Sequence, residues 1–131
     1  GEYVIVDKVS YSLNSPQRGD IIVFEKAAQP DLIKRVIGLP GDTVEVRNAQ
    51  VFVNGTALDE HYVANPPNYA FGPEQVESGR DIVLGDNRSN SSDSHAWGTV
   101  SKKRIIGKAW ISYWPPQLMG MVPDYTYASG K

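Results

Sequence analysis

Residues 43–55 read TVEVRNAQVFVNG and contain the pattern that decides the fold. Two pairs of valines alternate with other residues in this stretch, one pair on each side of a short polar link: Val44 and Val46, then Val51 and Val53. Alternation with a period of two is typical of a half-buried strand, and a short link between two such runs is typical of a hairpin. We therefore predict antiparallel strands at residues 43–46 and 50–53.

Similar apolar runs occur on both sides of this hairpin, at residues 3–9, 20–25, 32–37, 82–84 and 105–114. Clusters of Pro, Gly and polar residues separate them, and no segment of useful length has a helical period. Short helical turns are expected only near residues 87–92 or 101–104. Many short strands with regular turns predict a mostly β fold, an antiparallel sandwich or barrel. Residues 54–81 are richer in Pro, Asn and Gly, so we expect a loop-like insertion there.

Composition narrows the functional classes. The chain has 131 residues, enough for one domain, and its net charge of -2 gives no reason to expect nucleic acid as a partner. It has no cysteine, and His61 and His95 are too far apart to form a metal-binding motif, so we expect no metal and no cofactor. No apolar run is long enough to span a membrane, and no signal peptide is visible. The abrupt start inside an apolar run suggests an excised piece of a longer protein.

Lys34 is the first candidate for chemistry. If residues 32–37 form a strand, Leu32, Lys34 and Val36 share one face, so the ammonium lies between two aliphatic side chains. Burial lowers the pKa of an amine, and a neutral lysine can act as a general base. The ordinary alternative is a solvated lysine on an edge strand, and spacing alone favours that alternative.

The second candidate is residues 85–94, GDNRSNSSDS, directly after the apolar run at 82–84. Its many short polar side chains offer hydroxyl and amide partners that can hold a neutral amine in place. A solvated turn rich in Asp, Asn and Ser is the alternative, and composition alone favours it.

Three segments together, and in this order, resemble the type I signal peptidases, a family of Ser/Lys membrane proteases. Residues 18–24 (RGDIIVF) are similar to the R-G-D-hydrophobic motif of that family. Residues 34–42 (KRVIGLPGD) are similar to the motif that contains the catalytic lysine, and residues 85–94 to the G-D-N-R-x-x-S-x-D-S motif. The resemblance covers residues 1–116, the expected catalytic body, and it implies an antiparallel β-sandwich or barrel-like fold. Residues 117–131 depart from it, and we expect a disordered or artificial tail.

The resemblance implies roles for individual residues. Lys34 takes the place of the general base, and Ser91 that of the hydroxyl that hydrogen-bonds it. Asp93 takes the place of a structural carboxylate that pairs with a basic residue two positions later; here that residue is His95, where the family usually has arginine. Arg88 is the alternative partner for Asp93. Gly85 and Asn87 fall on the same motif and are expected to be structural.

In the resembled family, a serine in an S-M-x-P segment attacks the scissile carbonyl of a signal peptide after a small-x-small site. The 131 residues contain no S-M-x-P segment. We therefore expect the nucleophile and the membrane anchor to lie upstream of Gly1, with the catalytic body on the extracytoplasmic side, and the 131 residues alone not to cleave peptides. The backbone of residues 31–33 is expected to pair with the substrate, with Asp31 at its start and Val4, Leu32 and Ile33 as pocket walls or as ordinary core.

Other readings remain open. The membrane surface is an expected partner, and Trp97, Trp110, Trp114, Tyr113 and Phe71 form either an interfacial patch or core. The main functional alternative is a module that binds signal peptides without cleaving them. A self-cleaving repressor-type peptidase and a purely structural β-domain explain the three motifs less well. The oligomeric state does not follow from the sequence.

Overall fold

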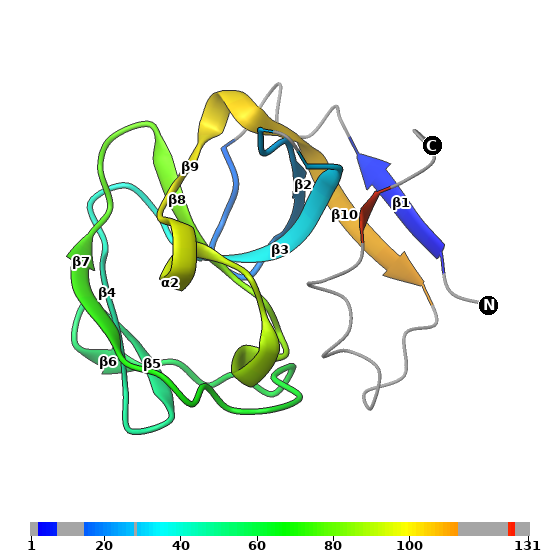
Figure 1. Cartoon of the computed structure of the whole chain (residues 1–131). Helices are drawn as coiled ribbons and strands as arrows, with labels where there is room; N and C mark the ends of the chain where they lie inside the picture. Colours follow the sequence, from blue (N-terminus) through cyan, green and yellow to red (C-terminus); the bar gives the residue numbers. More distant parts are fainter. Residues whose placement is uncertain (1–2, 8–14, 28, 113–125, 128–131) are drawn as a thin grey trace.

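The computed structural model describes residues 3–7, 15–27, 29–112 and 126–127, with the backbone alone for 3–7, 110–112 and 126–127. These residues form two β-sheets placed side by side (Figure 1). The strand pairs between named strands are all antiparallel in this part of the chain. The predicted mostly β, antiparallel fold is therefore confirmed.

The larger sheet has the order β1-β10-β2-β3-β8-β9, and β11 also pairs with β3. Its strands are β1 (Tyr3–Asp7), β2 (Ile21–Phe24), β3 (Asp31–Gly38), β8 (Arg80–Leu84), β9 (Val100–Ser101), β10 (Ile105–Ser112) and β11 (Thr126–Tyr127). The apolar runs predicted as strands appear here, with ends shifted by one or two residues where the chain is described. Tyr113, Trp114 and the tail residues other than 126–127 lie outside the described residues.

The smaller sheet has the order β6-β5-β4-β7 and contains the hairpin from which the sequence analysis began. Its strands are β4 (Thr43–Arg47), β5 (Gln50–Val53), β6 (Thr56–Ala57) and β7 (Phe71–Gln75). Val44 pairs with Val53 and Val46 with Val51, as the alternation predicts. Asn48 and Ala49, at the turn, both have positive φ angles, of 51° and 62°, which matches the twist of a two-residue hairpin.

The prediction of a loop-like insertion at residues 54–81 is wrong for its two strand segments. β6 pairs with β5, and β7 pairs with β4 at the other edge of the small sheet. The sequence of β7 hides it, because Gly72 and Pro73 are weak strand residues and Pro cannot donate to a ladder. An edge strand tolerates such a residue, since one side of its backbone has no neighbour to bond.

Three short helical segments complete the described chain: η1 (Arg88–Asn90), α2 (Ser94–Trp97) and η2 (Lys102–Arg104). The first and third fall where helical turns were expected. The four residues of α2 are too few to show a helical period, so the sequence did not predict it.

β3 and β8 lie between two core clusters, because both of their faces are covered. One face of β3 contributes Ile37 to the cluster shared with the small sheet, and the other contributes Val36 to a cluster that contains Ile22 and Phe24. β8 divides in the same way, with Ile82 in the first cluster and Val83 in the second. Any polar side chain in the middle of β3 is therefore forced to be buried, whichever face it takes.

Trp97 and Phe71 pack against different core clusters, Trp97 beside Phe24 and Phe71 beside the valines of the small sheet. The core alternative thus fits both better than a shared aromatic patch. Among the residues that the structure describes, no helix is long and apolar enough to cross a membrane.

Candidate active site

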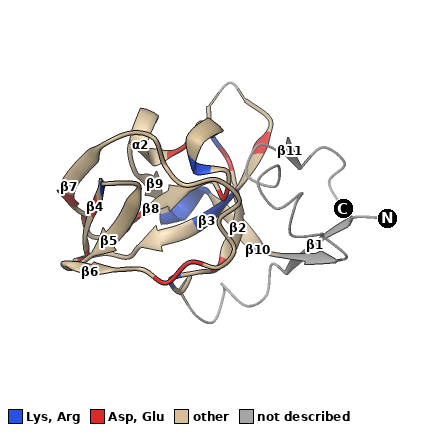
Figure 2. Cartoon of the chain, turned by 90° about the horizontal axis from the view of Figure 1, so that it is seen from below, with Lys and Arg blue, Asp and Glu red and all other residues tan. Residues whose placement is uncertain are grey.

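Lys34 and Arg35 lie next to each other in the middle of β3, so strand geometry directs them to opposite faces. Figure 2 shows this basic segment of β3 between β2 and β8. Lys34 is buried, with 2% of its surface exposed, and its cross-strand partner is Ile22 of the second core cluster. The solvated alternative for Lys34 is therefore wrong, because almost none of its surface is exposed.

The Lys34 amine lies 3.2 Å from the hydroxyl oxygen of Ser91, at hydrogen-bond distance. The two residues are 57 positions apart in sequence, and the pairing of β3 with β8 brings them together, since Ser91 belongs to the turn that follows β8. Residues 85–94 are likewise not a freely solvated turn, because Asp86, Arg88, Asp93 and Ser94 are all buried.

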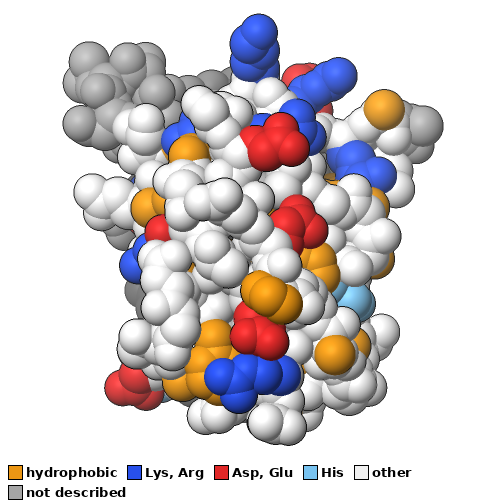
Figure 3. All heavy atoms as spheres, turned by 90° about the vertical axis from the view of Figure 1, so that its left-hand side faces the viewer, with side chains coloured by type: hydrophobic (Ala, Val, Ile, Leu, Met, Phe, Trp, Pro, Cys, Tyr) orange, Lys and Arg blue, Asp and Glu red, His pale blue; other side chains and the backbone are white. Residues whose placement is uncertain are grey.

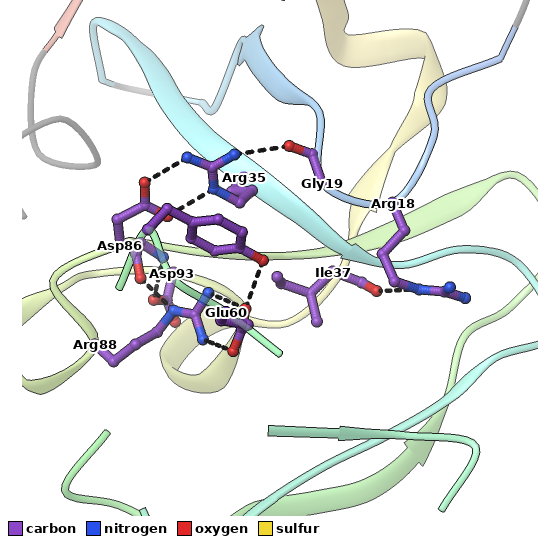
Figure 4. A network of polar contacts seen from close by, with 10 residues as sticks. Arg18, Gly19, Arg35, Ile37, Glu60, Asp86, Arg88 and Asp93 are labelled. Atoms are coloured by element: carbon purple, nitrogen blue, oxygen red, sulfur yellow. Dashed lines mark hydrogen bonds and ion pairs between the residues drawn. The ribbon is translucent and has the colours of Figure 1, made fainter. Parts of the chain in front are cut away.

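Arg35, on the opposite face, anchors this turn (Figure 4). Its guanidinium donates two hydrogen bonds to Asp86, of 2.8 and 2.7 Å, and a third of 2.8 Å to the carbonyl of Gly19. The centroid of the Tyr62 ring lies 3.8 Å from the guanidinium carbon. Paired and stacked in this way, a buried arginine is a rigid link between β3, the 85–94 turn and the segment before β2.

Asp93 is completely buried and accepts hydrogen bonds from two backbone amides, those of Gly85 at 2.9 Å and His95 at 3.0 Å. Its carboxylate also contacts Nδ1 of His95. His95 is in turn stacked on Tyr69, with ring centroids 3.7 Å apart. Asp93 is the N-cap of α2, so one carboxylate closes the turn at Gly85 and starts the helix that ends at Trp97.

Arg88 does not contact Asp93 through any described hydrogen bond or ion pair; its partner is Glu60 (Figure 4). Two hydrogen bonds, of 2.9 and 2.7 Å, join the guanidinium to the Glu60 carboxylate, and its Nε donates to the carbonyl of Gly85. Burial opposes the charge of Arg88, but the hydrogen bond and the charge of Glu60 outweigh it and raise the pKa of the guanidinium. Glu60 belongs to residues 54–81, so this region holds the turn in place.

The remaining motif residues have structural contacts. Asn87 accepts a hydrogen bond of 3.1 Å from the side chain of Asn65, and the backbones of these two residues form an isolated bridge. Arg18 binds Asp42 at 2.7 Å and the carbonyl of Ile37 at 3.2 Å, which joins two of the three sequence motifs across β3. Ser94 accepts a hydrogen bond of 2.9 Å from the amide of Val83.

The N-terminal half of β3 offers a backbone edge beside Lys34. β2 occupies one edge through the Phe24–Leu32 pair, whereas β8 pairs with the other edge only from Arg35 onward. On that second edge, β11 pairs with Leu32 and Asp31. Residues 126–127, predicted to belong to a disordered or artificial tail, are thus a strand on the edge that the resemblance assigns to the substrate.

The candidate pocket residues are not all alike. Asp31 and Leu32 are half-buried, whereas Ile33 has no exposed surface and belongs to the core, the alternative kept open for it. Val4 lies in β1, where it pairs with Ile111 of β10, two strands away from β3. Its side chain is outside the described part of the chain.

Sequence reasoning missed three residues that build the site: Arg35, Asp86 and Glu60. The first two carried a signal, since Arg35 directly follows Lys34 in a strand and Asp86 is the second residue of the polar turn. Glu60 carried none, because nothing in the local pattern of residues 54–81 distinguishes it from a solvated carboxylate.

Comparison with known proteins places this chain in a family. Residues 1–114 match the family described as signal peptidase, peptidase S26, and the chain belongs to that family. A signal peptidase I of Leptolyngbya laminosa is 50% identical over 126 residues, which cover 89% of this chain and 62% of that protein. The probable signal peptidase I-2 of Synechocystis is 45% identical over 92% of this chain and 59% of that protein. The chain thus spans about three fifths of the length of these two relatives.

A solved structure agrees with the fold. The crystal structure of a signal peptidase I from Enterococcus faecalis superposes with a TM-score of 0.66 at 34% sequence identity, and the match covers 73% of this chain and 97% of that one. The family resemblance drawn from the three motifs is therefore confirmed, as is its mostly antiparallel β fold.

Proposed function

We propose that this chain is the catalytic body of a serine endopeptidase that removes signal peptides from exported preproteins by a Ser/Lys dyad. The observation that carries the proposal is the buried Lys34 amine at 3.2 Å from the Ser91 hydroxyl. Ser91 belongs to the 85–94 turn, which Asp86, Asp93 and Arg88 hold in place. A preorganised amine in an apolar setting suits the general base of acyl transfer.

In the proposed mechanism, Lys34 removes the proton from a serine hydroxyl as that oxygen attacks the carbonyl after the small-x-small site. The acyl-enzyme forms, and Lys34 donates the proton to the leaving amine. Lys34 then activates the water that releases the signal peptide. Ser91 orients the amine and does not attack. By family resemblance, the attacking serine belongs to an S-M-x-P segment, which the 131 residues do not contain.

The preprotein binds as an added strand on the edge of β3 at residues 31–33. Two observations support this site: the edge is free of β8 before Arg35, and β11 demonstrates that a strand fits there. Backbone hydrogen bonds give such a complex its affinity, and shallow pockets for alternate side chains select small residues. We place the whole protein at the extracytoplasmic surface of a membrane, where preproteins emerge.

The second candidate is a module that binds signal peptides without cleaving them. The strand pairing at residues 31–32 favours it, because an edge that pairs with β11 can bind an extended peptide whether or not a bond is cleaved. The two functions differ in what an added nucleophile does, since a catalytic body gains turnover whereas a binding module does not.

The test measures cleavage of a fluorogenic peptide with an Ala-x-Ala site by two proteins: the 131 residues alone and the same chain extended upstream by an S-M-x-P segment. We expect cleavage only by the extended protein, and only with Lys34 intact. Ser91→Ala should lower kcat with little change in KM, because it misplaces the base without touching the binding edge. Cleavage by the extended protein carrying Lys34→Met would refute the proposed base.

A further inference from the structure

The basic residues of the described chain divide into two groups. Six of them have a carboxylate within 4.0 Å: Arg18, Arg35, Arg47, Arg88, Lys102 and Lys108. Lys34 contacts Ser91 in the candidate active site. The other four have no carboxylate partner in the described part of the chain, and all four line one pocket: Lys26, Arg80, Lys103 and Arg104. Four cations around one pocket, each without a carboxylate partner among the described residues, require a separate explanation in a chain whose net charge is -2.

This pocket, which we call the basic pocket, has a volume of about 410 Å³. Its walls come from the end of β2 and the residues after it, from the start of β8, and from the segment between α2 and β10. Glu25 is the one carboxylate among its lining residues, so the lining has an excess of three positive charges. In Figure 3 several of the visible basic side chains gather at the top of the molecule, the end at which Figure 1 places β9.

An aromatic wall fixes one side of the basic pocket. The Trp97 ring packs against Phe24, with centroids 6.0 Å apart, and the Lys26 amine lies 5.1 Å from the Trp97 centroid. The indole nitrogen of Trp97 donates a hydrogen bond of 3.1 Å to Ser92. Because Ser92 follows Ser91, this wall is joined directly to the turn that holds Lys34.

The four basic residues of the pocket come from different segments of the chain. Arg80 donates to the carbonyl of Thr99 at 3.0 Å and also to its hydroxyl, which leaves the guanidinium fixed at the pocket wall. Lys103 and Arg104 project from η2, which begins with Ser101 accepting a hydrogen bond of 3.3 Å from the Lys103 amide. Two arginines and two lysines from three segments therefore converge on one space, rather than lying along one exposed helix.

The basic pocket lies on the same sheet face as the candidate base. Phe24 pairs with Leu32, and Leu32 and Lys34 are two residues apart on β3, so all three point to one side. A ligand in the pocket therefore lies on the side of β3 from which Leu32 and Lys34 project.

We infer that the basic pocket binds the phosphate headgroup of an anionic membrane lipid. Arginine forks match phosphate oxygens, and a group with several acceptor oxygens can satisfy several cations at once. The indole wall fits the region between headgroup and acyl chain, where tryptophan is enriched in membrane proteins. A peptide carboxylate offers a single charge and two oxygens, which is a poorer match for four cations. The inference rests on the proposed membrane location, and it turns the face of β3 that carries Lys34 toward the lipid surface.

The test is sedimentation of the 131-residue protein with phosphatidylcholine vesicles that contain or lack phosphatidylglycerol. We expect binding only with phosphatidylglycerol, weakened by added salt. Lys103→Gln with Arg104→Gln should weaken it roughly thirtyfold, because each basic residue near an anionic surface contributes about a factor of five. Arg47→Glu is the matched control, since it changes the net charge equally at an exposed site on the small sheet and should leave binding within about twofold.

Further measurements separate the alternatives. Inorganic phosphate and glycerophosphoglycerol are titrated against the vesicle complex, and displacement by inorganic phosphate at low concentration would identify a free-phosphate site and overturn the lipid assignment. If the control and the double variant lose vesicle binding equally, the binding is a non-specific effect of charge, and this result also overturns the lipid assignment. Binding of an acidic peptide without binding of vesicles would assign the pocket to the preprotein instead. Lys34→Met should bind vesicles as well as the unmodified chain, so loss of the proposed catalysis leaves this result intact.

Discussion

The pair formed by Arg88 and Glu60 provides the sharpest test of how the site is supported. Arg88 has no exposed surface and Glu60 is nearly buried, yet their side chains form an ion pair with two hydrogen bonds. Changing Glu60→Gln keeps the shape of the side chain but removes its charge. The arginine is then left buried without its ion-pair partner, beside the turn that contains Ser91.

Breaking a buried ion pair from one side costs about 3–5 kcal/mol, because the remaining charge stays desolvated. Glutamine still accepts one hydrogen bond, so we expect the lower end of that range, about 3 kcal/mol. At roughly 3–5 °C per kcal/mol for a domain of this size, the melting temperature should fall by about 10–15 °C. In the double variant Glu60→Gln with Arg88→Met the uncompensated charge is gone, and we expect at least half of the loss to be recovered.

Urea unfolding followed by tryptophan fluorescence measures these free energies, with equal m-values as the check that each variant unfolds in the same two-state transition. The exposed pair between Arg47 and Glu45 gives the matched control, since Glu45→Gln removes a charge from a surface pair and should cost less than about 1 kcal/mol. If Glu60→Gln costs no more than this control, or if the two changes in the double variant simply add, the pair does not hold the turn.

Three further predictions follow from packing, burial and strand pairing. Gly38→Ala should destabilise the fold by about 1–3 kcal/mol in urea unfolding, because a Cβ atom there would lie 2.6 Å from a methyl carbon of Val44; a loss below about 0.5 kcal/mol would contradict this packing. Burial raises the pKa of Asp81 to about 6, although Lys102 opposes the shift. The folded state therefore binds the proton of Asp81 more tightly than the unfolded chain does. Protonation of Asp81 stabilises the fold fully below about pH 4, and this contribution to the free energy of unfolding is lost as the pH rises through 6. Between pH 4 and pH 8 the free energy of unfolding of Asp81→Asn should thus rise relative to that of the unmodified chain by on the order of 2–3 kcal/mol. A difference between the two proteins that does not change with pH would contradict the raised pKa of Asp81. Removing residues 117–131 deletes β11 and should tighten the binding of an Ala-x-Ala peptide to the edge of β3, as measured by calorimetry; unchanged affinity would show that β11 does not compete for that edge.

The strands were predictable where their signal is local. Alternating valines define β4 and β5, and the two-residue turn between the strands fixes which residue of β4 pairs with which residue of β5. β7 was missed because its sequence has low strand propensity and only its position at a sheet edge makes it a strand. Propensity describes the local backbone, whereas edge or centre position is decided by the rest of the fold.

The contact between Lys34 and Ser91 could not be deduced from spacing, since the two residues are 57 positions apart and all four strands of the smaller sheet lie between them in sequence. Composition favoured ordinary solvated roles for both residues, and only the family resemblance paired them. The support by Glu60 escaped even the resemblance, because a carboxylate in residues 54–81 becomes a partner for Arg88 only once the fold has brought the two segments together.

The order of residues 34 and 35 shows how one strand can hold the 85–94 turn and also present the proposed base. Neighbouring residues in a strand face opposite ways, so β3 presents one cation to each side of the sheet. The turn after β8 meets both, and it gives the carboxylate of Asp86 to Arg35 and the hydroxyl of Ser91 to Lys34. Its other carboxylate, Asp93, is directed to Gly85 and His95. One turn thus holds both cations of β3 by hydrogen bonds, one on each side of the sheet.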